Sequence, residues 1–364
     1  MKFLFLEPFY GGSHRDFAKG LAAHCCHDIH LVTLPARFWK WRMRGAALHF
    51  ISTLGDLSVY DGIVTTGLMS LADFSALCSG RCPPVLLYLH ESQITYPLAP
   101  GESMDMQFGF TDITTALCAD RILFNSQFHC DRFFTELPGF IGRMPEFKPL
   151  WAVDAIRSKA GVLHPGCRFD PASREPAALP DGPPLIVWNH RWEFDKNPDA
   201  FFAALDQVDR RRIDFGLVIL GETSQAKPSA FLEARSRFGT KIVQYGYVAS
   251  KEEYVQWLAK GNVAVSTAIQ ENFGIAAVEA MRYGCLPLLP RRLSYPEILP
   301  KEFHREFLYL NDEDLASRLA LMLRNPDRFV HHRRVIGDMM ARHAWASVID
   351  HYDRELEDLS KLRN

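Results

Sequence analysis

Short apolar runs alternate with amphipathic stretches along most of this 364-residue chain. Apolar runs of strand length occur at 2–8, 28–35, 61–67, 84–91 and 120–126, and again at 184–191, 215–222, 240–248, 262–269 and 286–291. Helix-like segments separate them, for example SHRDFAKGLAAHC at 13–25 and FFAALDQV at 201–208. This alternation predicts βαβ units and mainly parallel sheets, so the chain is expected to be an α/β protein.

One stretch interrupts the alternation. Residues 164–184, HPGCRFDPASREPAALPDGPP, are rich in proline, glycine and small residues and lack a helix or strand period. We therefore predict a Rossmann-like domain at 1–165, a linker at 166–183, a second Rossmann-like domain at 184–335 and a helical tail at 336–364. Because open parallel sheets bind ligands at the carboxyl ends of their strands, we expect these ends to line a shared cleft.

The composition excludes several classes of protein. Hydrophobic residues make up 48% and charged residues 23% of the chain, as in ordinary globular proteins. No apolar run approaches the ~20 residues that span a bilayer, and the start MKFLFLEPF is too short and too broken for a signal peptide. The 8 cysteines include no CxxC pair, and Cys78 with Cys82 does not by itself make a zinc site. These features predict a reduced, cytoplasmic protein.

The net charge of −2 argues against a wholly basic nucleic-acid coat, but residues 1–50 hold seven basic and only three acidic residues. Much of this excess lies in ARFWKWRMRG, 36–45, whose candidate binding residues are Arg37, Trp39, Lys40, Trp41, Arg42 and Arg44. Cationic groups suit phosphates and exposed aromatic rings suit unstacked bases. An amphipathic helix with inward-packed tryptophans and a solvated basic face explains the residues equally well.

Two segments of the second domain have charged residues next to the expected start of a helix or the expected end of a strand. In ENFGIAAVE, Glu271 and Glu279 are about two helical turns apart, and Phe273-Gly274-Ile275 has the character of a tight helix entry that favours an anion. In NHRWEFDKNP, which follows a buried strand, Arg191 and Lys196 are close enough in sequence to converge on one diphosphate. The alternatives without a binding role are a helix with a solvated face for the first segment and a charged surface turn for the second.

Three segments of the first domain place polar groups after strands. In EPFYGGSH, Gly11 and Gly12 lack the GxGxxG spacing, which rejects a dinucleotide fingerprint, and Ser13 is a natural cap for a helix that includes His14. Glu7 either faces the cleft or braces this loop. His90 and Glu91 end VLLYLHE, while Asn125 and Ser126 end DRILFNS, where a helix cap is the simpler interpretation.

These motifs resemble a known family. The Glu-x7-Glu pair, the Arg…Lys turn before it and the ending HAWASVIDHYDRELEDL, with Trp345 and Tyr352, resemble retaining GT-B glycosyltransferases of the GT4 type; the glycine usual before the arginine is His190 here. EPFYGGSH, LPARFWKWRMRGAAL, LHESQITYP and FNSQFHCDRF resemble the narrower GT4 subgroup that mannosylates queuosine in tRNA. The resemblance implies two doubly wound domains facing a central cleft, with the C-terminal helix crossing back to the N-terminal domain.

The resemblance also implies residue roles. The implied catalytic residues are His90, Arg191, Lys196 and Glu271. Donor-binding positions are implied at Gly11, Gly12, Arg191, Lys196, Glu271, Asn272, Phe273, Gly274, Ile275 and Glu279, with Glu279 on the ribose and Glu271 on the sugar. Acceptor positions are implied at Glu7, Ser13, His14, Glu91 and Asn125 and across the 36–45 segment, where the resemblance favours RNA contact.

The expected activity is transfer of mannose from GDP-mannose to queuosine in the anticodon loop of tRNA, namely tRNA-Asp, with retention of configuration. No metal clamp of the DxD type is evident, since Asp105 and Asp112 are scattered acids, so no metal cofactor is expected. Two alternatives stay open. One is a GT4 enzyme acting on a lipid or saccharide, and the other is a tRNA- or nucleotide-binding module without catalysis.

Overall fold

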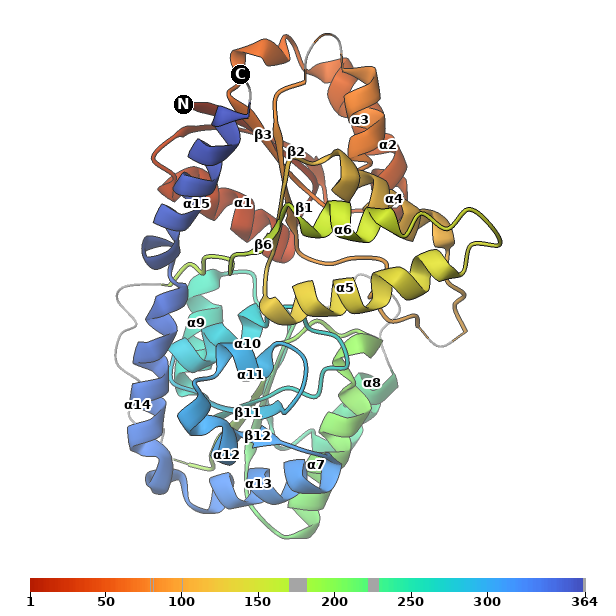
Figure 1. Cartoon of the computed structure of the whole chain (residues 1–364). Helices are drawn as coiled ribbons and strands as arrows, with labels where there is room; N and C mark the ends of the chain where they lie inside the picture. The colour runs from red at the N-terminus through yellow and green to blue at the C-terminus, as the bar shows by residue number, and fades with distance from the viewer. Residues whose placement is uncertain (79, 81, 100, 170–181, 222–228, 363–364) are drawn as a thin grey trace. The chain divides into compact units, whose positions relative to one another are not determined.

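The chain folds into two compact units, each described here by itself. In a computed structural model, unit 1 comprises Met1–Arg168 and His343–Asn364, and unit 2 comprises Phe169–Arg342 (Figure 1). The structure describes all residues except 79, 81, 100, 170–181, 222–228 and 363–364. Most of the predicted linker, 166–183, therefore lies outside the described residues. No helix of the described parts is long and apolar enough to cross a membrane.

Unit 1 contains a parallel sheet of six strands. They are β1 (Lys2–Tyr10), β2 (Asp28–Pro35), β3 (Gly62–Thr66), β4 (Val85–Leu89), β5 (Arg121–Phe124) and β6 (Ala160–Val162). Their order is β2-β1-β3-β4-β5-β6, so the direction of winding reverses between β1 and β3. In open sheets of this kind, ligands bind outside the carboxyl ends of the strands at such a switch point.

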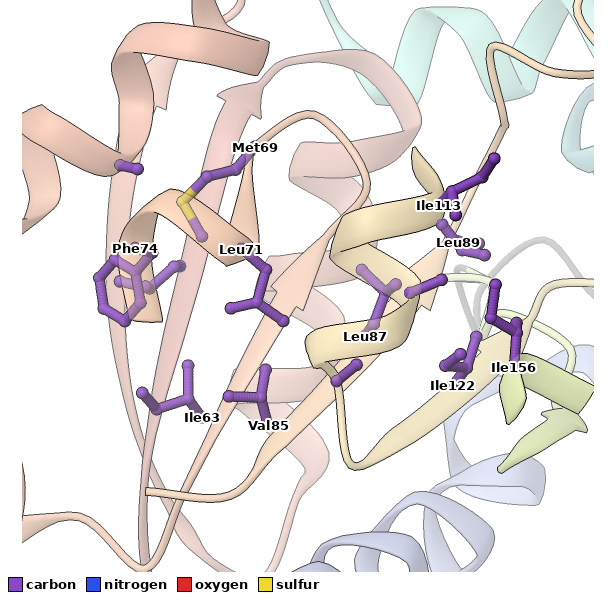
Figure 2. Packing of buried hydrophobic residues seen from close by; sticks show 14 of the residues in the cluster. Ile63, Met69, Leu71, Phe74, Val85, Leu87, Leu89, Ile113, Ile122 and Ile156 are labelled. Carbon is purple, nitrogen blue, oxygen red and sulfur yellow. The ribbon is translucent and has the colours of Figure 1, made fainter. Parts of the chain in front are cut away.

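Helices cover both faces of this sheet, which explains why its strands read as nearly continuous apolar runs. The helices are α1 (Gly12–His24), α2 (Trp39–Thr53), α3 (Leu71–Leu77), α4 (Met106–Cys118), α5 (Gln127–Gly142), α6 (Trp151–Arg157) and α15 (Trp345–Lys361). Leu4 and Leu6 of β1 point into a core shared with α2 to α6, part of which Figure 2 shows. Phe3 and Phe5 point to the opposite face, where α1 and α15 pack.

The last helix, α15, belongs to the core of unit 1. The Trp345 ring lies so close to Gly20 of α1 that a Cβ atom there would stand 1.9 Å from the indole nitrogen. Gly166 meets the same ring, and Tyr352 donates a hydrogen bond of 2.8 Å to the His164 carbonyl. The expected return of the C-terminal helix to the first domain is thus confirmed. At Gly20 and Gly166, the contact with the Trp345 ring leaves no room for a residue larger than glycine.

Unit 2 repeats the architecture with a different strand order. Its strands are β7 (Leu185–Trp188), β8 (Gly216–Leu220), β9 (Ile242–Gly246), β10 (Val263–Val265), β11 (Leu286–Pro290) and β12 (Leu308–Tyr309), in the order β12-β11-β10-β7-β8-β9. The main helices are α7 (Pro198–Arg210), α8 (Ser229–Phe238), α9 (Lys251–Lys260), α10 (Ile275–Arg282), α11 (Tyr295–Ile298), α12 (His304–Phe307), α13 (Asp312–Arg324) and α14 (Val330–Met339). The switch point lies between β7 and β10.

Candidate active site

The switch point of unit 2 gathers a buried ion cluster. After β7 the chain forms a short 3-10 turn, η3 (Phe194–Lys196), which buries Lys196 so that 7% of the residue is exposed. Its ammonium donates a hydrogen bond of 2.8 Å to the Gln270 carbonyl and lies 3.3 Å from carboxylate oxygens of Asp195 and Glu271. Lys196 after β7 and Glu271 after β10 therefore meet at the switch point, as their positions in the sequence suggest.

The surroundings fix the charges of this cluster. Burial is the largest single influence on the pKa of Glu271 and raises it, but the charge and hydrogen bond of Lys196 together with the neighbouring His190 and Arg191 outweigh burial, so the pKa is lowered and the carboxylate is ionised. Burial and the same ammonium lower the pKa of His190 to about 4, so its ring is neutral. Glu271 is thus an acceptor of hydrogen bonds, suited to sugar hydroxyls, beside a cation suited to a phosphate.

Arg191 occupies a different environment from Lys196. Its side chain is 60% exposed, and its guanidinium lies 3.2 Å from a carboxylate oxygen of Glu193. Because most of this side chain faces solvent, it keeps more rotamer freedom than the buried Lys196 and can adapt its position to a diphosphate. The turn 189–198 thus supplies one fixed cation and one adaptable cation. Their predicted convergence on a diphosphate stays a prediction.

The entry to α10 has the tight geometry expected for Phe273-Gly274-Ile275. Gly274 precedes the helix with a φ of 100°, a left-handed conformation that a side chain would strain. A Cβ atom at this position would also stand 3.1 Å from the Ile298 side chain. Asn272 and Phe273 are buried on one side of this glycine, and Ile275 is half-buried on the other. A glycine is therefore required here.

Glu279 of α10 lies among polar side chains of neighbouring elements. The residue is 8% exposed, and its carboxylate accepts hydrogen bonds from the ammonium of Lys251 and, at 3.0 Å, from the Tyr254 hydroxyl. Asn189, which follows β7, donates to the same hydroxyl at 2.9 Å. Lys251 and Tyr254 come from α9 and had no signal in the sequence, because no spacing rule links them to Glu279.

In unit 1, polar groups from the ends of β1, β3 and β4 meet around His14. Glu7 is fully buried, and it accepts hydrogen bonds from the Phe9 amide at 2.8 Å and the Thr66 hydroxyl at 3.2 Å. Nδ1 of His14 lies 3.3 Å from both Glu7 oxygens, while its Nε2 lies 3.4 Å from Glu91. The His90 ring lies tilted beside it, with 4.2 Å between ring centroids. Four predicted residues therefore form one cluster.

This cluster separates the protonation states of its two histidines. Burial alone would lower the pKa of His14, but the carboxylates of Glu7 and Glu91 prevail and raise it to about 10. Burial and the positive charge of His14 hold the pKa of His90 well below its usual range. At neutral pH the cluster thus contains an imidazolium beside a neutral imidazole. A neutral His90 can accept a hydrogen bond at one ring nitrogen and donate one at the other, as contact with a sugar hydroxyl requires.

Asn125 and Ser126 at the end of β5 are structural partners of the cluster. The Asn125 amide donates to the His90 carbonyl at 3.0 Å, and its oxygen lies 2.9 Å from Nδ1 of the buried His129. Ser126 caps α5 by accepting from the His129 amide, so the simpler interpretation of Ser126 is confirmed. Asn125 fixes the backbone beneath His90.

The predicted cap at Ser13 is wrong. Helix α1 begins at Gly12, its N-cap is Gly11, and no side chain caps it. The reason is the turn at Gly12, whose φ of 50° follows an extended Gly11 and moves Ser13 into the first helical turn. Gly11 itself packs against Ala36, where a Cβ atom would stand 2.4 Å from the alanine Cβ. The paired glycine thus shapes the path of the backbone.

The basic and aromatic segment 36–45 contains the start of α2. Trp41 is 76% exposed, so it does not pack inward, whereas Trp39 is half-buried with its ring 5.1 Å from that of Phe108. Arg37, Lys40 and Arg44 are exposed, and Arg42 is half-buried. The alternative with both tryptophans packed inward therefore fails for Trp41.

Among the residues that the structure describes, two groups of side chains have ligand atoms spaced closely enough for a metal ion. They are Glu7, His14 and His90, and the peripheral group Cys26, His27 and Glu357, with ligand atoms within 4.8 Å of one another. In the buried group, His14 already reaches Glu7 and Glu91 at hydrogen-bond distance through its two ring nitrogens. Two protons on this ring satisfy both carboxylates, so the geometry fits an imidazolium.

Comparison with known proteins establishes the general class of this protein before its particular family. The fold matches sucrose-phosphate synthase of Thermosynechococcus elongatus with a TM-score of 0.75 over 100% of both chains at 15% identity. A family model described as glycosyl transferases group 1 matches residues 169–338. The D-inositol 3-phosphate glycosyltransferase 2 of Catenulispora acidiphila is 25% identical over 266 residues, which cover 67% of this chain and 58% of that protein. The chain is a GT-B glycosyltransferase.

Two further matches place the chain in a narrower family within this class. A model described as tRNA-queuosine alpha-mannosyltransferase N-terminal matches residues 2–167. The tRNA-queuosine alpha-mannosyltransferase of Drosophila melanogaster is 35% identical over 341 residues, which cover 91% of this chain and 89% of that protein. The chain belongs to the tRNA-queuosine alpha-mannosyltransferase family, and the resemblance seen in its motifs is confirmed.

Proposed function

We propose that this protein transfers mannose from GDP-mannose to the queuosine nucleoside of tRNA, with tRNA-Asp as the acceptor and with retention of configuration. The observation that carries the proposal is the family relationship over 91% of the chain. The relationship implies a queuosine-containing tRNA acceptor and a sugar donor. The polar clusters at the two switch points support it, because each lies where an open sheet binds ligands. A cytoplasmic location follows as a prediction.

The donor is proposed to bind unit 2. Lys196 and Arg191 balance the charge of the diphosphate, Glu271 accepts hydrogen bonds from sugar hydroxyls, and Glu279 accepts them from the ribose. Lys251 and Tyr254 hold the Glu279 carboxylate in place, and two further lone-pair sites on its oxygens remain for ribose hydroxyls. The amides of Phe273, Gly274 and Ile275 at the start of α10 suit phosphate or sugar oxygens.

The acceptor is proposed to bind unit 1. His90 faces the transferred sugar. The ion network of Glu7, His14 and Glu91 beside it keeps the net charge around the sugar constant. In a front-side mechanism the departing phosphate takes the proton of the acceptor hydroxyl, so bond making and bond breaking occur on one sugar face. Most of the catalysis then comes from preorganised charge, and removal of one such group typically costs ~10²–10³ in rate.

The decisive experiment supplies the purified protein with labelled GDP-mannose and two tRNA pools, one containing queuosine and one lacking it. Label that enters only the queuosine-containing pool supports donor and acceptor together. If neither pool is labelled but GDP raises the melting temperature more than UDP does, the donor assignment holds and the tRNA acceptor fails. If neither nucleotide binds, the protein is not a transferase of this kind.

A lipid acceptor is the second candidate, because Phe38 and Trp41 are 69% and 76% exposed next to basic residues, a pattern that also suits an anionic membrane surface. Salt-sensitive binding to anionic vesicles together with absent tRNA binding favours this candidate. The opposite pattern favours the RNA acceptor. The two assays use the same protein sample at the same ionic strength.

A further inference from the structure

Two exposed phenylalanines of unit 1 adopt an unusual backbone conformation. Phe38, with φ 56°, directly precedes α2, and Phe147, with φ 48°, lies just before α6. The two residues are 69% and 86% exposed. A left-handed conformation costs a non-glycine residue roughly 1–2 kcal/mol, and packing in the core does not offset that cost for a ring in solvent. The conformation therefore calls for an explanation outside the core.

Exposed tryptophans accompany both phenylalanines. Trp41 stands in the first turn of α2, and Trp151, which is 66% exposed, is the first residue of α6. Of the five large aromatic residues that are exposed among the described residues, these four belong to two short segments, and the fifth is Tyr247 of unit 2. Isolated exposed apolar residues are common, but such concentration of aromatic rings is typical of a binding surface.

The beginning of α4 connects the two segments. Arg44 of α2 donates a hydrogen bond of 3.1 Å to the Gln107 side chain, while Nη1 of Arg143 lies 2.7 Å from the sulfur of Met104. Residues 104–108 thus contact both α2 and the loop between α5 and α6. In Figure 1 that loop extends outward from unit 1, on the side where α2 and α4 also lie. The two segments that carry the four aromatic residues consequently meet the same short stretch, 104–108.

The charges beside these rings suit a polyanion. Segment 36–45 contains four basic residues and no acidic one. The loop 143–150 contains Arg143 and Lys148, both exposed, against the single acid Glu146. Arginine and lysine neutralise phosphates, and flat exposed rings stack on unpaired bases. A loop of single-stranded RNA offers both groups at once.

We propose that Phe147 and Trp151, together with Phe38 and Trp41, form a platform on which unstacked bases of the acceptor RNA lie. The inference rests on the proposed function and adds a second contact region, 143–151, to the one at α2. The region falls within residues 2–167, which match the model particular to this family, and outside residues 169–338, which match the general glycosyltransferase model. An element that recognises the particular acceptor belongs in the first part.

The test compares the full-length protein with the double variant Phe147→Ala/Trp151→Ala in binding to queuosine-containing tRNA at fixed salt. Loss of one stacked base weakens binding by at least about fivefold, so loss of two raises the Kd by at least about 30-fold. Both side chains are exposed, hence the melting temperature and its rise with GDP should stay unchanged. The single variants Val59→Ala and Leu77→Ala, which truncate exposed apolar residues elsewhere in unit 1, should bind tRNA normally.

The outcomes separate this inference from the proposed function. If the wild type binds tRNA and the double variant binds it within twofold, the platform is overturned while the proposed function stands. If the double variant keeps tRNA binding but loses binding to anionic vesicles, the rings face a membrane, which also overturns the inference. If the wild type binds no tRNA at all, the proposed function fails and the platform fails with it.

Discussion

The charge on His14 leads to a quantitative prediction about stability and pH. His14 is buried against Glu7 and Glu91 and beside the His90 ring, and its pKa is raised to about 10. The perturbation is a change of pH from 6.5 to 9.0, applied to the wild type and to His14→Gln. Glutamine retains a hydrogen-bond donor at this position but has no charge. The comparison therefore isolates the contribution of the His14 proton to stability.

The expected size follows from the difference between the folded pKa and the ordinary histidine pKa of 6.5, which applies to the unfolded chain. One pKa unit corresponds to about 1.4 kcal/mol, which gives about 5 kcal/mol as the full contribution of the proton. Because the folded pKa is raised, this contribution is complete below about pH 6.5 and disappears as the pH rises toward 10. Between pH 6.5 and 9.0 the folded state holds one more proton than the unfolded state, so stability falls by about 3 kcal/mol.

Urea unfolding of both proteins across this pH range measures the effect. The variant should be much less stable than the wild type at pH 6.5, and the gap should narrow by about 3 kcal/mol by pH 9.0. A gap that stays constant across the range would refute the argument. Histidine proton NMR gives an independent check, since the resonance missing from the variant should not titrate between pH 5 and 8.

Three further predictions concern the donor site of unit 2. Glu271→Ala should abolish mannose transfer and leave tRNA binding nearly intact, as seen by a transfer assay beside a binding assay; equal loss of both would remove Glu271 from the sugar. Lys196→Met should destabilise the protein by ~3–5 kcal/mol in urea unfolding, because the buried Asp195 and the half-buried Glu271 lose their cation; Arg191→Met, at an exposed position, is the matched control. Tyr254→Phe should weaken GDP binding several-fold in calorimetry, because Glu279 loses one of its two positioning donors; unchanged affinity would show that Lys251 alone suffices.

The strands could be predicted because both faces of each sheet are buried, so almost every residue in a run such as KFLFL is apolar. The short strands β6 and β12 had no comparable signal, since they span only 3 and 2 residues. The sequence singled out Glu7, His90 and Lys196 as polar residues near the ends of buried strands, and Glu271 by its spacing from Glu279. The structure gathers them into two polar clusters, while their roles stay predictions.

Partners that come from other elements could not be predicted. Lys251 and Tyr254 approach Glu279 from 28 and 25 residues away, a distance set by the packing of α9 against α10 and by no local period. The misplaced cap at Ser13 has a similar origin, because Gly11 is held in its extended conformation next to Ala36 on another segment. The exposed ring of Phe147 was missed since its surroundings, RMPEFKPL, read as an ordinary loop.

The return of α15 to unit 1 determines when this protein can finish folding during synthesis. The first 168 residues leave the ribosome early, but the face formed by Phe3, Phe5 and Phe17 is covered only when Trp345 and the residues after it arrive. Unit 2 can therefore finish folding first, while this apolar face of unit 1 is still exposed to solvent. A nascent chain that stalls before residue 345 would present this surface to chaperones, although every residue of the proposed acceptor pocket has already been made.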